Sequence, residues 1–326
     1  MRILVTGGAG YIGSHTARLL ADAGHEPVVF DDLSQGHDWA VRWGPLEAGS
    51  LTDRARLDEV LRSARVEAVV HFAARALVGE SMTNPAAYFE TNVLGTFNLL
   101  EAMRAAGVAT LVFSSTCATY GDPVRVPIDE THPQAPVNPY GESKLMVEKM
   151  LRWYGEAYGL RWMALRYFNA AGADPNGEIG EVHDPETHLI PLVIEGTLGR
   201  RPPVKVFGSD YPTPDGTAIR DYIHVVDLAD AHLRALERLG AGTPSQALNL
   251  GTGRGHSVRE VIETVRTVSR QDVPFEPAPR RAGDPPMLVA DASRAREVLG
   301  WEPKYPELST IVEHAWRWHT EGKAGR

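Results

Sequence analysis

The chain has 326 residues, of which 43% are hydrophobic and 23% charged, values that are ordinary for globular proteins and exclude a disordered or fibrous chain. The 33 lysines and arginines against 42 acidic residues give a net charge of −9, which argues against nucleic acid or an anionic membrane as the main partner. The single cysteine, Cys117, excludes a disulfide scaffold and a cysteine-built zinc site. No signal-peptide-like or membrane-spanning apolar run is present, so we expect a cytoplasmic protein. We also expect no bound metal.

Short apolar runs alternate with helical stretches through the first half of the chain. The pattern predicts strands at 3–5, 27–30, 67–72, 110–115 and 161–168, and helices at 11–23, 86–106 and 139–158. Strands that alternate with helices form right-handed crossovers and a parallel sheet covered on both faces. Residues 1–170 are therefore predicted to be one doubly wound, Rossmann-like α/β domain.

The second half of the chain differs from the first in composition and in the length of its predicted elements. The stretch after residue 168 is rich in Gly, Asp, Asn and Pro, and shorter strands follow near 204–207 and 219–224, before a Pro-rich stretch at 273–286. We expect residues 171–326 to form a smaller, mixed α/β lobe that binds substrate, with some segments returning to the main sheet.

The first strand is followed by the turn TGGAGYIGS, in which Gly7, Gly10 and Gly13 are regularly spaced. Between a strand and a helix, such glycines let a pyrophosphate approach bare backbone at the positive end of the helix. The second strand ends at Asp31, whose carboxylate would bond ribose hydroxyls and repel a 2′-phosphate, which favours NAD over NADP. The alternative is an ordinary Gly-rich turn in which Asp31 caps a strand end.

Tyr140 and Lys144 lie one helical turn apart in NPYGESK, after Asn138 and Pro139, which fit an N-cap and first helical position. For Tyr140 to act as a base near neutral pH, its pKa must fall by roughly 3 units, or about 4 kcal/mol. Positive charges on Lys144 and on an oxidised nicotinamide, each about 6–7 Å away, would each supply roughly 2.5 kcal/mol at an effective dielectric constant near 20. Neither charge suffices alone.

A third group is expected at the tip of the strand that ends in VFSST. Thr116 lies at the carboxyl end of a predicted parallel strand, where ligands bind in sheets of this kind. Its hydroxyl could bond the same substrate oxygen as Tyr140. The alternative is plain strand-end capping.

Further stretches extend the pattern over the whole chain, and with them the sequence resembles the extended short-chain dehydrogenase/reductases, and within these the UDP-glucose (UDP-galactose) 4-epimerases. The stretches are MRILVTGGAGYIGSH, VVHFAA, VGESM, ETNVLGT, FSSTCATYGD, PYGESKLMVE, LRYFNAAGA, DYPTPDGTAIRDYIHVVDLADAH, NLGTG, and the segment from PRRAGDPP to VADASRA. The DGTAIRDYIHV run is particularly characteristic of these epimerases.

The resemblance implies an isomerase with a tightly bound NAD and no net redox change. Tyr140 would take the proton from the sugar 4-hydroxyl as hydride leaves C4, and the 4-keto sugar would turn over and receive the hydride on its other face. The implied cofactor-binding residues are Gly7, Gly10, Tyr11, Ile12, Gly13, Asp31, Asp32, Leu33, Ser34, Ser50, Leu51, Phe72, Ala73, Ala74, Asn92, Lys144 and Phe168. The implied contacts to a UDP-sugar are Thr116, Tyr140, Asn169, Leu189, Phe207, Arg220, Tyr222, Arg281, Asp284 and Leu288.

Several positions depart from the family pattern. Cys117 and Ala118 stand where the dehydratase relatives place two carboxylates, so dehydration is not expected. Ser50 replaces the usual Asp, which weakens the adenine contact there. His188 stands where some members have Asn, and reads equally well as a solvated loop residue or a neighbour of uracil. Leu288 is smaller than the Tyr that restricts some members to non-acetylated hexoses, so we expect partial activity on UDP-N-acetylhexosamines.

Two alternatives stay open at this stage. One is an epimerase for another UDP-sugar, such as a pentose or a glucuronate, and the other is a non-catalytic NAD-sensing protein. The resemblance also implies a homodimer, formed through the long helices at 86–106 and 140–158.

Overall fold

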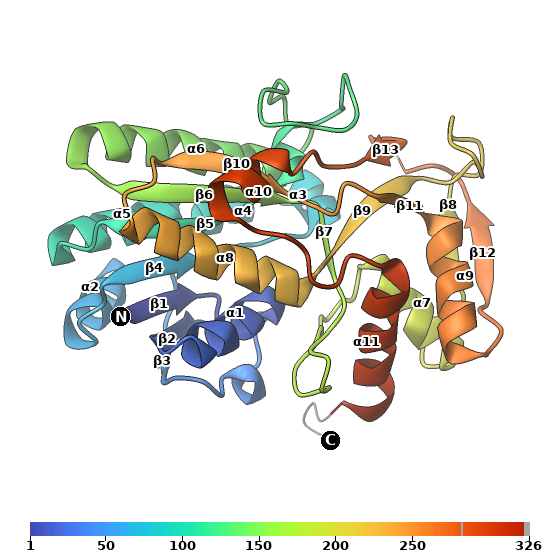
Figure 1. The fold of residues 1–326 in the computed structure, drawn as a ribbon, viewed down its shortest axis with the longest axis horizontal. Helices are drawn as coiled ribbons and strands as arrows, with labels where there is room; N and C mark the ends of the chain where they lie inside the picture. The colour runs from blue at the N-terminus through green and yellow to red at the C-terminus, as the bar shows by residue number, and fades with distance from the viewer. Residues whose placement is uncertain (282, 323–326) are drawn as a thin grey trace.

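The computed structural model describes residues 1–281 and 283–322. Its largest element is a parallel sheet of seven strands, drawn with its helices to the left in Figure 1. In order across the sheet, the strands are β10 (Gln246–Leu250), β6 (Arg161–Tyr167), β5 (Thr110–Thr116), β4 (Ala68–His71), β1 (Arg2–Thr6), β2 (Glu26–Asp31) and β3 (Leu46–Ala48). The predicted parallel, doubly wound sheet is confirmed. β1 pairs on one side with β2 and on the other with β4, so the strand order reverses at β1.

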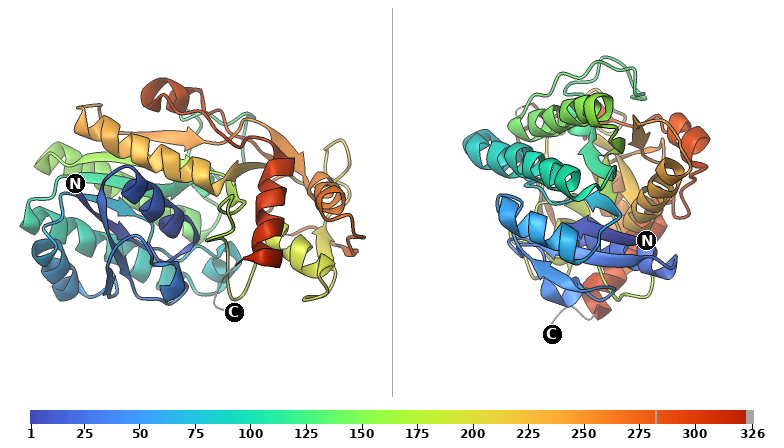
Figure 2. Two further views of the ribbon diagram at one scale, coloured as in Figure 1. Left: turned by 60° about the horizontal axis from the view of Figure 1, so that its bottom comes forward. Right: turned by 90° about the vertical axis from the view of Figure 1, so that its left-hand side faces the viewer.

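Helices cover both faces of this sheet. Successive strand residues point to opposite faces, and they are apolar on both, so each face needs a covering layer. On one face Ile3 and Val5 pack with α1 (Tyr11–Asp22), α8 (Val225–Gly240) and α10 (Ser293–Leu299). On the other face Leu4 packs with α2 (Arg54–Ser63), α5 (Gly95–Ala106) and α6 (Pro139–Tyr158). The two helical layers lie on opposite sides of the sheet in Figure 2.

The helix predicted over 86–106 is interrupted, so that prediction is wrong in part. It consists of α4 (Pro85–Tyr88), a π-helical segment at Phe89–Leu94, and α5. A short helix α3 (Val78–Thr83) precedes them. The wider turn coincides with a tight contact, because a Cβ on Gly95 would lie 2.8 Å from the Cβ of Leu51. A π-segment is a local distortion that hydrophobic periodicity alone does not reveal.

The remaining elements form the lobe at the right of Figure 1. Its strands are β7 (Asn169–Ala171), β8 (Val204–Phe207), β9 (Ile219–His224), β11 (Gly255–Ser257), β12 (Phe275–Ala278) and β13 (Met287–Leu288). Its helices are α7 (Leu189–Thr197), α9 (Val258–Ser269) and α11 (Leu308–Glu321). β9 pairs with β7, β11 and β13, while β8 pairs with β12.

Two segments from the second half of the chain join the first domain. β10 pairs in parallel with β6 at the edge of the large sheet, and α8 packs beside α1 on one face. A division into residues 1–170 and 171–326 thus separates β10 and α8 from the sheet with which they pack. The domain boundary itself stays a prediction. Within the described residues, no helix is long and apolar enough to cross a membrane.

Candidate active site

The turn after β1 is shaped by its glycines. Gly7 has a φ of 70°, and a Cβ there would come within 2.5 Å of the backbone nitrogen of Ala73. A Cβ on Gly13 would lie 2.1 Å from the carbonyl oxygen of Gly7. Gly10 is the N-cap of α1, and a Cβ there would meet only the Gly7 carbonyl, at 3.3 Å. The turn therefore keeps bare backbone at the start of α1, as an anion-binding turn requires.

We expect Gly13→Ala to lower the unfolding free energy by about 3 kcal/mol, because the methyl group must displace the Gly7 backbone. Gly79→Ala is the matched control, since a Cβ on Gly79 in α3 meets nothing within 4 Å. Urea denaturation of both variants measures the difference. Equal stabilities would show that the turn adapts and that the close approach does not require glycine.

Asp31 lies at the end of β2, next to the glycine turn. Its carboxylate accepts hydrogen bonds from the backbone N–H groups of Ala9, at 3.0 Å, and Leu33, at 2.9 Å. Burial raises the pKa of Asp31, and the two N–H bonds act in the opposite direction. The neighbouring turn is held by Asp32, which accepts the N–H of Ser34 at 3.0 Å. The carboxylate of Asp31 is thus fixed at the carboxyl edge of the sheet, beside the start of α1.

The other predicted cofactor residues lie around the same edge. Phe72 and Ala73 follow β4, and both of their N–H groups bond the carbonyl of Thr6. Asn92 is buried, and its amide bonds both backbone groups of Arg75 and the hydroxyl of Ser143. The Asn92 side chain therefore holds the loop after β4 against α6, a positioning role that the sequence analysis did not foresee.

Three further predicted cofactor residues are occupied by contacts within the protein. The Tyr11 hydroxyl donates to the carbonyl of Gly172 at 2.7 Å. The Ser50 hydroxyl bonds Thr52, and Leu51 is buried in the core beneath α2 and α5.

The last three predicted cofactor residues lie on different elements. Ala74 is in the loop after β4, and Ile12 is in the first turn of α1. Phe168 packs in a small apolar cluster beside Leu288.

Tyr140 and Lys144 extend from the first turns of α6 toward the end of β5. The helix begins where the sequence predicts, because the Asn138 side chain accepts the N–H of Gly141 at 2.8 Å. The Lys144 ammonium is buried, donates to the carbonyl of Ser114 at 2.9 Å, and lies 6.0 Å from the centre of the Tyr140 ring. Thr116, the last residue of β5, lies near enough to Tyr140 for its side chain to lower the pKa of the tyrosine, and its hydroxyl accepts the N–H of Ala118 at 3.1 Å. The structure thus brings the three predicted catalytic residues together.

The pKa of Tyr140 is shifted upward, whereas a catalytic base near neutral pH needs a lowered pKa. Burial raises the pKa of Tyr140, and Tyr167 raises it further, while the side chain of Thr116 lowers it. Burial also lowers the pKa of Lys144 to about 7. The chain's own groups therefore do not make Tyr140 a base. The expectation that Lys144 and a second positive charge together lower this pKa stays a prediction.

The other predicted substrate residues lie in the second lobe, and several of them are on or next to β9. Asn169 pairs in register with Tyr222, and Leu288 pairs with Arg220, which places both pairs around the central strand β9. The Arg220 guanidinium forms an ion pair with Asp284 and donates to the carbonyl of Ile219.

The remaining substrate predictions lie on two other elements. Arg281 stacks its guanidinium over the ring of Phe207, 4.0 Å from the ring centre. Leu189 is the first residue of α7. Arg220 is thus half-buried and paired with Asp284, whereas Arg281 is exposed and rests against the ring of Phe207.

Two buried residues that support this arrangement were missed by the sequence analysis. Glu148 on α6 forms a two-bond ion pair with Arg166 on β6, at 2.6 and 2.9 Å, which fixes α6 over the sheet. Asp221 on β9 is buried, and it accepts the N–H groups of Thr252, Gly253 and Ala290. The available signal was a carboxylate in the middle of a predicted strand, because a buried carboxylate requires partners.

The chain matches the model of the NAD dependent epimerase/dehydratase family over residues 3–251. It belongs to this family. The UDP-glucose 4-epimerase of Halalkalibacterium halodurans is 54% identical, over 100% of the chain and 97% of the relative. The crystal structure of UDP-glucose 4-epimerase from Brucella ovis in complex with NAD has a TM-score of 0.95 and 53% identity, and covers 97% of both chains. The Bifidobacterium longum enzyme in complex with NAD+ and UDP has a TM-score of 0.93 and 35% identity, and covers 98% of both chains.

Proposed function

We propose that the protein is an NAD-dependent UDP-glucose 4-epimerase, which interconverts UDP-galactose and UDP-glucose. The observation that carries the proposal is the grouping of Thr116, Tyr140 and the buried Lys144 at the carboxyl edge of the parallel sheet. Full-length relatives at 50–57% identity that are named UDP-glucose 4-epimerase support the same assignment.

The glycine turn and Asp31 fit NAD. Bare backbone at the start of α1 suits the pyrophosphate, and the fixed Asp31 carboxylate suits the ribose hydroxyls while disfavouring a 2′-phosphate. Lys144 would contact the nicotinamide ribose, and Phe168 would lie near the nicotinamide. When bound, NAD supplies the hydride acceptor for C4 of the sugar and the donor for the return step.

The side chains of the protein would then manage the proton. Tyr140 takes the proton of the sugar 4-hydroxyl as the C4–H bond breaks, and returns it after the 4-keto sugar has turned over. Lys144 favours the tyrosinate through its charge, and Thr116 donates a hydrogen bond to the same sugar oxygen. Arg220 and Arg281 fit the pyrophosphate of the UDP group, because guanidinium groups bond phosphate oxygens in pairs.

Incubation of the purified protein with UDP-galactose, without added NAD, tests this proposal. Chromatography of the nucleotide sugars should show UDP-glucose, which would demonstrate both the reaction and a retained cofactor. If no UDP-glucose forms even with NAD supplied, the proposed function is wrong.

We further propose that Leu288 gives partial activity on UDP-N-acetylglucosamine. Leu288 lies in register with Arg220 and packs against the cluster that contains Phe168. We expect Leu288→Ala to raise kcat/KM for the acetylated sugar about tenfold, the effect of a few methylene groups in a pocket, while UDP-galactose serves as the control substrate. A wild-type rate below one-thousandth of that on UDP-galactose, with no gain in the variant, would contradict the proposal.

We also propose that the protein is a cytoplasmic homodimer, with residues 1–170 binding NAD and the lobe binding the sugar nucleotide. An exposed apolar groove between α6 and the π-helical segment with the start of α5 supports the dimer. Its lining residues are Phe89, Val93, Leu94, Phe97, Met146 and Met150. We expect wild-type protein to have twice the mass of one chain by light scattering and Phe97→Glu to be monomeric. Phe275→Glu is the control, because Phe275 is equally exposed but lies on β12. A monomeric wild type, or a dimeric Phe97→Glu variant, would contradict this interface.

A further inference from the structure

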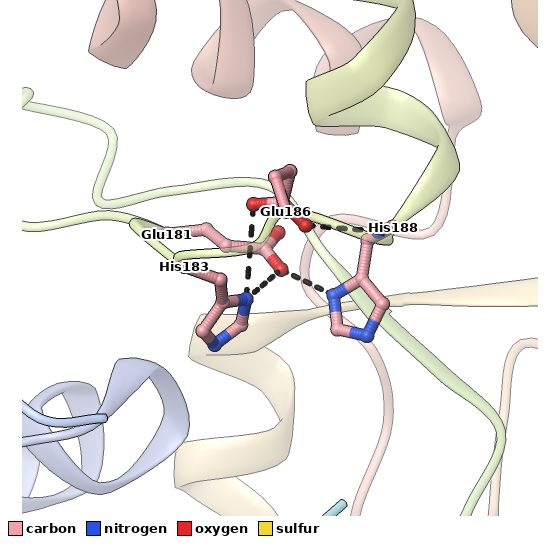
Figure 3. Close-up of side chains that lie close together, drawn as sticks. All are labelled: Glu181, His183, Glu186 and His188. Carbon is pink, nitrogen blue, oxygen red and sulfur yellow. Dashed lines mark hydrogen bonds and ion pairs between the residues drawn. The ribbon is translucent and has the colours of Figure 1, made fainter. Parts of the chain in front are cut away.

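Apart from the catalytic group, four side chains with potential metal-ligand atoms lie together in the loop between β7 and α7. Glu181, His183, Glu186 and His188 each offer one ligand atom, and these four atoms all lie within 4.8 Å of one another. Figure 3 shows both imidazoles turned toward the two carboxylates. None of the four belongs to the proposed catalytic group.

The two carboxylates are buried where burial is unfavourable without a cation. The side chains of Glu181 and Glu186 are each 3% exposed, and their ion-pair partners are the imidazoles of His183 and His188. The site thus favours positive charge, which protons or a metal ion could supply.

The spacing of the ligand atoms matches a single ion. Zinc bonds to nitrogen and oxygen are about 2.0–2.2 Å long, so tetrahedral ligand atoms lie roughly 3.3 Å apart. The Nδ1 atom of His183 lies 3.1 Å from Oε1 of Glu181 and 3.7 Å from Oε2 of Glu186. The Nδ1 atom of His188 contacts the same oxygen of Glu181. Small shifts would bring all four atoms around one centre.

Hydrogen bonds from the protein hold the two glutamates in place, as they commonly do in protein metal sites. Oε1 of Glu186 accepts the N–H groups of Thr187, at 2.7 Å, and His188, at 2.8 Å, which leaves Oε2 facing His183. The Trp318 indole donates to the carbonyl of Glu181 at 3.0 Å. Such bonds hold ligands in orientation. A cavity of about 170 Å³, lined in part by Glu181, His183 and Glu186, adjoins the cluster and offers an ion a way in.

We propose that Glu181, His183, Glu186 and His188 bind one divalent transition-metal ion, with zinc the best match. Two imidazole nitrogens with two carboxylate oxygens suit zinc, whereas magnesium and calcium prefer oxygen ligands only. The role is structural. The His183 ring lies edge-on to Tyr11 in α1, with centres 6.3 Å apart, and His188 directly precedes α7. The ion therefore joins the loop to the helix that follows the glycine turn and to the start of α7.

The sequence analysis predicted no metal and treated His188 only as a loop residue or a neighbour of uracil. It missed this site because the signal lies in four polar residues of one loop, EVHDPETH, without any cysteine. Only the folded loop shows that the side chains converge.

Calorimetric titration with Zn²⁺ alone tests the proposal on protein treated with EDTA and then freed of it. We expect the wild type to bind about one equivalent and to release protons, because the imidazoles must be deprotonated to bind metal. Mg²⁺ should not bind there. His183→Ala, His188→Ala and Glu181→Gln should each weaken Zn²⁺ binding at least about 100-fold, while His25→Ala, a histidine just before β2, should bind as the wild type does.

Two results would overturn the proposal. One is a wild type that binds no Zn²⁺, which would leave protons as the only cations in the cluster. The other is binding that the three cluster variants leave unchanged, which would place the ion elsewhere. Should a variant fail to fold, anomalous X-ray scattering at the zinc edge on wild-type crystals decides the question. A peak between Glu181 and His183 supports the site, and its absence there contradicts it.

Discussion

Tyr140→Phe is expected to lower kcat for UDP-galactose epimerisation by about 1,000-fold, the scale of a lost general acid–base group. The hydroxyl is the only group removed, and it is the group whose pKa the side chain of Thr116 lowers. NAD content should be unchanged, because the glycine turn and Asp31 are untouched. Steady-state kinetics and the absorbance of released cofactor measure the two effects separately.

Tyr154→Phe is the matched control for this change. Tyr154 lies on the same helix, but its hydroxyl donates to Glu101 at 2.9 Å, away from the catalytic group. We expect this variant to retain wild-type kcat. A Tyr140→Phe enzyme with more than about one-tenth of wild-type kcat would show that Tyr140 does not transfer the proton.

Lys144→Met is expected to lower kcat about 100-fold and at the same time to stabilise the protein. Removal of one positive charge about 6 Å from Tyr140 forfeits roughly 2.5 kcal/mol of stabilisation of the tyrosinate. Burial of the ammonium group costs folding free energy, which lowers the pKa of Lys144 to about 7. A buried methionine does not incur that cost.

The pH dependence of stability gives Lys144→Met a second readout. The folded-state pKa of about 7 lies below the unfolded value of about 10.4, so the unfolded chain binds more protons between these pH values. The wild-type unfolding free energy should therefore rise with pH across this window, and the variant should lack that rise. The control, Lys149→Met, changes an exposed lysine of the same helix and should alter neither kcat nor the pH profile. A destabilised Lys144→Met protein would contradict the account of this residue.

Much of the large sheet could be predicted because its signals are local. The helix expected at 139–158 is observed as Pro139–Tyr158, since Asn138 caps its start and Gly159, with a φ of 71°, ends it. The glycine turn and Thr116 were located in the same way, by residues next to a strand end. Local rules place these side chains at one edge of a parallel sheet without any knowledge of the rest of the fold.

The features that could not be predicted depend on distant segments. The pairing of β10 with β6 is set by tertiary packing rather than by either strand's own sequence. The ion pair of Arg220 with Asp284 and the occupied amide of Asn92 depend on partners from other elements. The raised pKa of Tyr140 follows from burial, which no spacing rule measures.

The central claim is that C4 of the sugar gives up its hydrogen as hydride and receives the same hydrogen back within one closed site. Mass spectrometry of the products formed from UDP-galactose deuterated at C4, in ordinary water, tests this claim most directly. We predict that the UDP-glucose formed retains the deuterium at C4, because the hydride does not exchange with solvent. Conversion with loss of the label to water, or no conversion at all, would contradict the account.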